Sequence, residues 1–202
     1  MIMRLFSTFF LIVLLSYSMT SFANPGKFVQ ANNLFPKVLI STSLGDIELE
    51  LDRSRAPITV NNFLSYVKDK RYNNTIFHRL ESEYVLQGGG YNTEFKAIVE
   101  REPIFNESGN GLKNTFGTIA MARVNDPHSA TSQFFFNLKD NPNLDPGSRW
   151  GYAVFGRITA GESVLEKIRQ QATDVSTELG WPNVPVEPIV IKMITVLPAP
   201  EL

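Results

Sequence analysis

Apolar residues in the first part of the chain repeat with two different periods, which predict a hairpin followed by a helix. Residues 37–43 and 46–51 flank Leu44-Gly45, and the second run alternates apolar with acidic positions. Such alternation around a short glycine-containing turn is typical of a β-hairpin. After Ala56-Pro57 the apolar positions share one helix face, because they are spaced i, i+3, i+4 and i+7 (Val60, Phe63, Leu64 and Val67). We expect this stripe to lie over the strands.

The rest of the chain consists mainly of short apolar runs separated by Gly, Asn and Pro. One further helical segment follows Gly161, and a Pro-rich passage from Trp181 to Pro188 leads into a final strand at 189–196. Short strands with such turn residues between them are typical of an antiparallel barrel or sandwich. The pattern therefore predicts a mainly β fold, with one closed β domain and two covering helices. The intermediate strands are expected at 75–80, 84–87, 117–121, 133–138 and 153–158.

The first residues have the pattern of an export signal. Arg4 precedes an apolar run at 9–15, and Ser21-Phe-Ala23 is a small-x-small cleavage site, which is the order of regions in a secretory signal peptide. An uncleaved membrane anchor is the alternative, but the run is short for a hydrocarbon layer of about 30 Å. We expect an exported protein, periplasmic if its source is Gram-negative. The predicted division is a signal peptide at 1–23, a loose N-terminal arm at 24–36, one domain at 37–197 and a tail at 198–202.

Composition narrows the functions open to the chain. A length of 202 residues with 43% hydrophobic content is enough to form one core. With 19 basic and 20 acidic side chains, neither nucleic acid nor, after signal removal, a membrane is an expected partner. Cysteine is absent, which excludes thiol catalysis, disulfides and a lipidated cysteine anchor. With two histidines, no zinc or other metal site is expected.

One set of motifs carries the candidate chemistry. Thr75-Ile-Phe-His-Arg-Leu80 is followed by Gln87-Gly-Gly-Gly90, and Ser132-Gln-Phe-Phe-Phe136 comes some fifty residues later. These motifs place one arginine and two glutamines among aromatic and aliphatic side chains, without an evident nucleophile. Such a site suits a reaction that needs electrostatic positioning and no bond making. Rotation about a peptide bond is a reaction of this kind.

Together with Gly117-Thr-Ile-Ala-Met-Ala122 and Phe155-Gly156, these motifs resemble the cyclophilin family of peptidyl-prolyl cis-trans isomerases, in particular its exported bacterial members. The resemblance extends from about Lys37 to Val196. It implies a closed eight-stranded antiparallel β-barrel capped by two α-helices. It also implies isomerisation of X-Pro bonds in unfolded or newly exported polypeptides, without a cofactor. We expect a monomer.

The resemblance gives roles to single positions. Arg79 matches the family's catalytic arginine, and Gln87 is the second residue expected to act in catalysis. Asn143 stands where many members have an aromatic ring that supports binding of the inhibitor cyclosporin, so weak cyclosporin binding is expected. Arg123 stands where asparagine is frequent in the family. The implied substrate-binding residues are Tyr84, Val85, Met121, Ala122, Arg123, Gln133, Phe135, Leu144 and Tyr152.

The reaction explains the need for arginine. Rotation about an amide has a barrier of about 18–20 kcal/mol, because the nitrogen lone pair is delocalised into the carbonyl. A catalyst must bind the twisted amide more tightly than either planar form. A permanently charged guanidinium can donate a hydrogen bond to the lone pair once twisting has localised it on nitrogen. Selection of proline needs, in addition, an apolar slot for its ring.

Other interpretations of these residues stay open. Arg79 can be the member of a surface ion pair, and Phe135 or Met121 can belong to the core. Alternation along the strand puts Gln133 and Phe135 on one face, with Phe134 and Phe136 on the other, so one phenylalanine set should line the barrel and the other the groove. For the whole chain the alternative is a proline-peptide binding module or holdase chaperone with little turnover. A lipocalin-like ligand barrel is disfavoured by the crowded aromatic residues.

The remaining candidates have simpler explanations. His78 neighbours Arg79 in a strand and should point to the opposite face, as a hydrogen-bonded core residue. His128 lies in a polar loop and should be solvated. Ser132 lies in no Gly-x-Ser-x-Gly elbow, which disfavours a hydrolase trio with Asp126 and His128. Gly88-Gly-Gly90 lacks the Gly-Lys-Ser/Thr of a phosphate loop and is expected to form a tight turn with a close strand approach.

Overall fold

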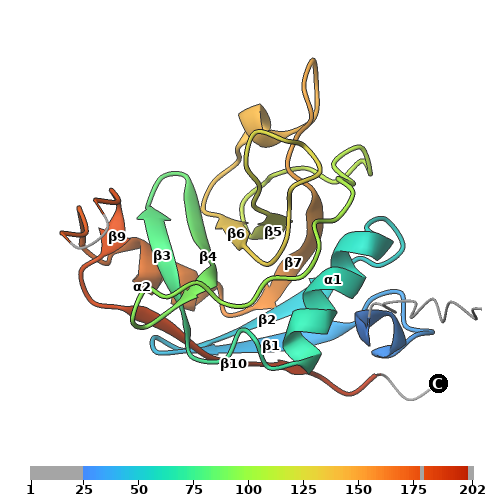
Figure 1. Ribbon diagram of the computed structural model, residues 1–202, viewed down its shortest axis with the longest axis horizontal. Coiled ribbons are helices and arrows are strands. Elements are labelled where there is room, and N and C mark those ends of the chain that lie inside the picture. The colour runs from blue at the N-terminus through green and yellow to red at the C-terminus, as the bar shows by residue number, and fades with distance from the viewer. Residues whose placement is uncertain (1–24, 178–179, 200–202) are drawn as a thin grey trace, which may run out of the picture.

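Eight antiparallel strands close into a barrel in the order β1-β10-β3-β4-β6-β5-β7-β2 in the computed structural model of the chain (Figure 1). The structure describes residues 25–177 and 180–199, so the predicted signal peptide at 1–23 lies outside the described residues. The closed barrel confirms the predicted fold class. The strands are β1 (Lys37–Thr42), β2 (Asp46–Leu51), β3 (Thr75–Glu81), β4 (Val85–Asn92), β5 (Thr118–Met121), β6 (Phe134–Asn137), β7 (Val154–Ala160) and β10 (Ile189–Val196).

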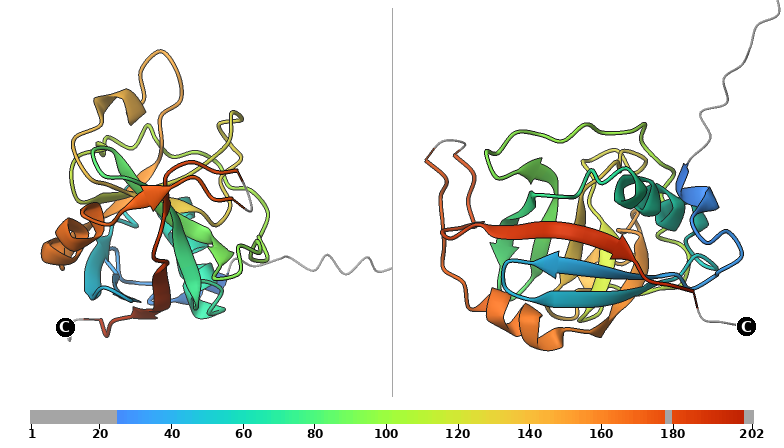
Figure 2. Two further views of the ribbon diagram at one scale, coloured as in Figure 1. Left: turned by 90° about the vertical axis from the view of Figure 1, so that its left-hand side faces the viewer. Right: turned by 90° about the horizontal axis from the view of Figure 1, so that it is seen from below.

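Two α-helices lie on opposite sides of the barrel, as Figures 1 and 2 show. They are α1 (Pro57–Lys68) and α2 (Glu162–Arg169), and both begin where the sequence predicts. Two short 3-10 helices, η1 (Pro25–Phe28) and η2 (Pro142–Leu144), were not predicted. Nor was the small ribbon in which β8 (Thr173–Asp174) pairs with β9 (Val184–Pro185). Neither helix α1 nor α2, within the described residues, is long and apolar enough to cross a bilayer.

The barrel interior is filled with aromatic rings. The Phe63 ring, from the predicted stripe of α1, lies 5.2 Å from Tyr72, 5.6 Å from Phe134 and 5.3 Å from Phe155, measured between ring centroids. All four side chains are fully buried. Burial of one such ring contributes about 1.5–3 kcal/mol, and these four rings pack together in the barrel interior.

The N-terminal arm is anchored to the domain, which corrects the prediction that it is loose. The guanidinium of Arg53 donates to the backbone carbonyl oxygens of Val29 at 2.8 Å, Gln30 at 2.7 Å and Asn33 at 2.6 Å. A Cβ atom on Gly26 would lie 1.8 Å from the Asn61 carbonyl oxygen, so η1 packs directly against α1. The side chains of the arm gave no sign of this attachment, because Arg53 binds backbone carbonyl groups, which every residue carries.

An irregularity in β3 decides which side chains face the groove. Phe77 pairs with Gly88 while Arg79 pairs with Gln87, so β3 uses one more residue than β4 between these pairs. This β-bulge lets both Phe77 and Leu80 enter the core although they are three positions apart. His78 and Arg79 both stay outside the core as a consequence.

The loops that connect β4 to β7 are long and lie over one side of the barrel. One of them, at 93–117, reaches α1, where the Glu107 carboxylate accepts hydrogen bonds from the backbone N–H groups of Ile58 and Thr59. An acidic group at this position satisfies N–H groups that have no partner inside the helix and favours the helix dipole. The loop is thus attached to helix α1 as well as to the two strands that it connects.

Candidate functional site

A second apolar cluster, separate from the barrel core, forms the floor of a groove. It consists of Val85, Ala120, Phe135, Leu144 and Val154, with Tyr84, Ala122 and Tyr152 among the half-buried residues packed against it. Alternation along β6 explains the division, since Phe134 and Phe136 enter the core while Phe135 faces the groove. The predicted split of these phenylalanines between interior and groove is confirmed.

Arg79 reaches the groove from β3 and is held on two sides. Its Nη1 atom donates to Oε1 of Gln87 at 3.1 Å, and its Nε atom donates to Oε1 of Glu81 at 3.1 Å. Nη2 also contacts that carboxylate oxygen. The Arg79 side chain stays 38% exposed and that of Glu81 33%. The guanidinium therefore has a fixed orientation and an open side from which a ligand can approach.

The hydrogen bonds continue from Gln87 to the residue that precedes β6. Nε2 of Gln87 donates to Oε1 of Gln133 at 2.9 Å. The Gln133 side chain occupies the space beside Gly90, where a Cβ atom would lie 2.7 Å from its Cδ atom. Gly88 to Gly90 lie within β4, so the expected close strand approach is present and the expected tight turn is not.

Nine of the eleven predicted site residues line one cleft beside the guanidinium. Gln133 lines the adjoining cleft and joins the site through Gln87. Met121 is different: it is buried in the core next to Ile119, because alternation along β5 turns Ala120 to the groove side instead. The structure thus places Met121 in the core and not in the lining of this cleft, and its role in substrate binding stays a prediction. The cleft residues are Arg79, Tyr84, Val85, Gln87, Ala122, Arg123, Phe135, Leu144 and Tyr152.

The aromatic walls of the cleft are positioned by neighbouring side chains. The Tyr152 ring meets the Phe135 ring edge-on, with centroids 5.5 Å apart. On the opposite side the Tyr84 hydroxyl accepts a hydrogen bond from Nδ2 of Asn143 at 3.2 Å. Asn143, where the family resemblance leads one to expect an aromatic ring, thus contacts another wall residue instead. The slot is apolar at its floor and polar at its rim.

Arg123 closes the far side of the cleft. Its Cζ atom lies 4.6 Å from the centroid of the Tyr152 ring, within the range of a cation–π contact. Its Nη2 atom donates to the Trp150 carbonyl at 2.8 Å and its Nη1 atom to the Val124 carbonyl at 2.9 Å. These bonds join two loops across the groove, so the arginine is a structural part of the wall.

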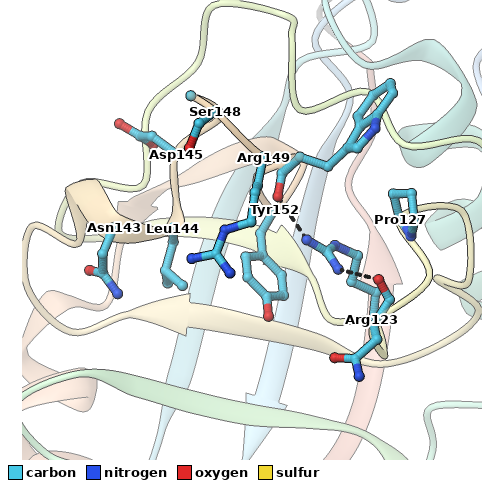
Figure 3. A pocket seen from close by; sticks show the side chains of 11 residues that line it. Arg123, Pro127, Asn143, Leu144, Asp145, Ser148, Arg149 and Tyr152 are labelled. Atoms are coloured by element: carbon cyan, nitrogen blue, oxygen red, sulfur yellow. Dashed lines mark hydrogen bonds between the residues drawn. The ribbon is translucent and has the colours of Figure 1, made fainter.

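A larger cleft, of about 660 Å³, adjoins the first and is shown in Figure 3. Arg123, Leu144 and Tyr152 line both clefts. Arg149 and Trp150, from the loop between η2 and β7, also line the larger one. Sequence reasoning missed these two residues, because a polar loop with a single tryptophan gives no signal of its position.

Sequence reasoning also missed Glu81. It lies two positions after Arg79 in the same strand, and alternate residues of a strand share a face. This spacing was the available signal. The Glu81 carboxylate forms an ion pair with the guanidinium of Arg79. Arg79 is therefore both a member of an ion pair and a residue of the groove.

The histidines differ in part from their predicted states. His78 is buried with 7% of its surface exposed, as predicted, but it lies outside the barrel core against Tyr91 and Trp181. Its Nδ1 atom has no hydrogen-bond partner among the described residues. Burial, together with the charge of Arg79, lowers the pKa of His78 to about 4. It is therefore neutral at pH 7.

His128 is half-buried and stacks on Phe105, with ring centroids 4.4 Å apart, which corrects the prediction that it is solvated. Its Nδ1 atom accepts a hydrogen bond from the backbone N–H of Asn106 at 3.2 Å. Ser132, in turn, has its Oγ atom 3.4 Å from a Glu100 carboxylate oxygen. These contacts give no support to a Ser132–His128 pair. Within the described ranges, no group of three His, Asp or Glu side chains could hold a metal ion.

Comparison with known proteins agrees with the geometry. Residues 37–196 match the family model "Cyclophilin type peptidyl-prolyl cis-trans isomerase/CLD". The chain is 48% identical over 164 residues to peptidyl-prolyl cis-trans isomerase cyp18 of Streptomyces antibioticus, covering 79% of this chain and 98% of that protein. It is 47% identical over 162 residues to peptidyl-prolyl cis-trans isomerase A of Dickeya dadantii, covering 79% and 84%.

Among solved structures, the fold is similar to a cyclophilin-type peptidyl-prolyl cis-trans isomerase of Cryptosporidium parvum. The two share a TM-score of 0.68 and 27% sequence identity, with 82% of this chain and 99% of that chain covered.

Proposed function

The chain belongs to the cyclophilin-type peptidyl-prolyl cis-trans isomerases, and from this premise we propose that Arg79 accelerates rotation about X-Pro bonds by stabilising the twisted amide. The observation that carries the proposal is the position of the guanidinium. It lies at the rim of an apolar cleft, held by Gln87 and Glu81, with one side open. Membership of the family carries the peptidyl-prolyl isomerase activity. The roles of the single residues are our inference.

The energetic argument starts from the electronic change during rotation. In the planar amide the nitrogen lone pair is shared with the carbonyl, and it becomes localised on the prolyl nitrogen as the bond twists. A hydrogen bond from Arg79 to that nitrogen is then stronger in the transition state than in either planar isomer, which is the condition for catalysis. Because its orientation is already fixed, the guanidinium needs little reorganisation when the amide twists.

The apolar floor supplies the preference for proline. Val85, Phe135 and Leu144 are buried in the cluster beneath the cleft. A pyrrolidine ring that packs on them would have its apolar surface removed from water. Gln133, which accepts a hydrogen bond from Gln87, offers its amide group to the flanking peptide. If one side of the substrate is held while the other turns, the ring acts as the fixed end.

The size of the effect is reasonable for these groups. A thousandfold acceleration requires about 4 kcal/mol of differential stabilisation. One hydrogen bond to a charged group contributes about 1.5–3 kcal/mol, and orientation of the substrate supplies the remainder. All groups that this mechanism uses are side chains of the chain itself.

The direct test is the isomer exchange of a proline peptide, followed by NMR, with the wild-type protein and Arg79→Ala. We expect kcat/KM to fall about a hundredfold, with Arg79→Lys in between because lysine keeps the charge and loses the planar fork. Arg157→Ala, at an exposed arginine of β7, is the matched control and should retain the wild-type rate. An unchanged rate in Arg79→Ala would refute the mechanism. Saturable binding without exchange in the wild type would instead indicate a proline-peptide binding module.

We further propose that the substrates are unfolded polypeptides outside the cytoplasm and that the inhibitor cyclosporin binds weakly. The export pattern at 1–23 supports the first point, and Asn143 in place of an aromatic ring supports the second. Cell fractionation with N-terminal sequencing of the mature protein tests the location. Titration of the isomerase activity with cyclosporin tests the affinity, and strong inhibition would contradict it.

A further inference from the structure

The cleft next to the proline site carries positive charge without a matching acidic group. Arg123 and Arg149 both line it, together with the aromatic side chains of Trp150 and Tyr152. In the part of the chain that the structure describes, neither arginine forms an ion pair with a carboxylate. A free guanidinium in a concave, partly apolar site is a typical partner for a carboxylate.

The acidic residue of this cleft does not neutralise the two arginines. Asp145 lines the cleft, but its Oδ1 atom accepts hydrogen bonds from the backbone N–H of Asn114 at 2.8 Å and from its Nδ2 atom at 3.1 Å. Its Oδ2 atom lies 3.5 Å from Nζ of Lys113. Figure 3 shows the Asp145 carboxylate turned away from Arg149 and Tyr152. Its charge is therefore already satisfied on the outer side of the loop.

The two arginines play different parts. Arg123 is held by four carbonyl oxygens, those of Val124, Asn125, Trp150 and Gly151, and lies over the Tyr152 ring. Its charge is fixed in the wall. Arg149 is exposed, and its side chain extends in Figure 3 from the loop toward Leu144 and Tyr152. It can therefore close on a ligand without breaking an existing ion pair.

We infer that this cleft binds an acidic side chain of the substrate, close in sequence to the isomerised proline. The inference rests on the proposed function and names a substrate preference for the same reaction. Since Leu144 and Tyr152 line both clefts, a bound peptide passes from one to the other within a few residues, at about 3.3–3.6 Å per residue. Arg149 is the specificity-determining residue, and Arg123 supplies a fixed background charge.

The expected preference is modest, because the guanidiniums are partly solvated. Exposed ion pairs in proteins are weak and screened by salt. We expect kcat/KM for a peptide with Glu near proline to exceed that of the matched Gln peptide by about three- to fivefold at low ionic strength, and the ratio to approach one as salt is added.

The experiment uses pairs of short peptides with one X-Pro bond, in which Glu or Gln occupies each of the three positions before and after proline in turn. Exchange is measured with the wild-type protein, Arg149→Gln and the charge-matched control Arg157→Gln. We expect the Glu advantage to appear at one or two positions, to fall toward one in Arg149→Gln and to persist in Arg157→Gln. Equal rates for Glu and Gln at every position, or an equal loss in both variants, would overturn the inference.

The same data separate this inference from the proposed function. If no peptide exchanges faster than without protein, the isomerase mechanism fails. If all peptides are accelerated but Glu and Gln do not differ, only the acidic preference fails. The salt dependence of the wild-type ratio gives a second readout that needs no variant, and a ratio that does not change with salt would also count against an ionic contact.

Discussion

Nη1 of Arg79 donates a hydrogen bond to Oε1 of Gln87 at 3.1 Å, across the pair of strands β3 and β4. The two residues are direct partners in the antiparallel register, so the backbone itself sets their separation. A charged group held by a strand neighbour is better fixed than one on a loop.

Gln87 should act as a positioning residue for Arg79. In Gln87→Ala the guanidinium loses one of its fixed contacts, and we expect kcat to fall about tenfold with KM little changed, which is about 1.4 kcal/mol of transition-state stabilisation. Gln87→Glu keeps an acceptor but loses the Nε2 donor to Gln133, so it should restore only part of the rate. Gln170→Ala, at an exposed residue that caps the C-terminal end of α2, serves as control. A rise in KM alone would contradict the positioning role.

Glu81 should restrain the activity of Arg79 through its charge. The pair is partly exposed on both sides, so it is worth about 1 kcal/mol or less. In Glu81→Gln the guanidinium keeps an acceptor of similar shape without the opposing charge, and we expect kcat/KM to rise about two- to fivefold at low salt. Glu83→Gln removes a carboxylate nearby in the chain that pairs with Arg169 instead and should leave kcat/KM unchanged. A fall in rate for Glu81→Gln would mean that the carboxylate mainly orients Arg79.

His78 should make the stability of the domain depend on pH. Its pKa is lowered to about 4 in the folded protein by burial and by Arg79, against about 6.5 for a free histidine. The unfolded chain therefore binds more protons between these values, and stability is complete above about pH 6.5 and is lost as the pH falls toward 4. The loss is at most about 3 kcal/mol.

Urea unfolding of the wild type and of His78→Gln at pH 7.5, 5.5 and 4.5 tests this dependence. The variant should be less stable at pH 7.5 but should show a smaller loss on acidification. His128→Gln is the control, since that histidine is half-buried and already has a partner on Nδ1. Parallel pH profiles for the wild type and His78→Gln would contradict the assignment.

Arg53 should be important for stability but not for catalysis. Replacement by Gln leaves three backbone carbonyl groups of the N-terminal arm without their donor, and we expect the free energy of unfolding to fall by about 2–4 kcal/mol. The value of kcat/KM should stay unchanged, because none of these partners lines the groove. Arg55→Gln, at a more exposed residue, should cost less than about 0.5 kcal/mol. Chemical denaturation and isomer exchange on the same samples provide both readouts.

Much of the fold could be predicted because its signals are local. The helix face at Val60 and Phe63 and the hairpin after Lys37 depend on periodicity within a few residues, and both are confirmed. The bonds of Arg53 to the arm and of Glu107 to the helix start depend on residues at least 20 positions apart. No periodic pattern encodes such contacts, so they could not be predicted from local sequence.

The candidate site shows the same division. The motifs around Arg79 and Gln133 predicted which side chains meet, since each motif lies on a strand whose register fixes its neighbours. Met121 lies in the core, and resemblance alone did not say which face of β5 it takes. Arg149 was missed because its position depends on the path of a loop, which short-range patterns do not determine.

The extra residue that β3 accommodates at His78 can be lost without moving the guanidinium. If His78 were deleted, Phe77, Arg79 and Leu80 would alternate regularly between the inside and the outside of the barrel, and Arg79 would stay opposite Gln87. A chain shortened by this one residue should therefore still isomerise X-Pro bonds, although it would lose the packing of the imidazole against Tyr91 and Trp181.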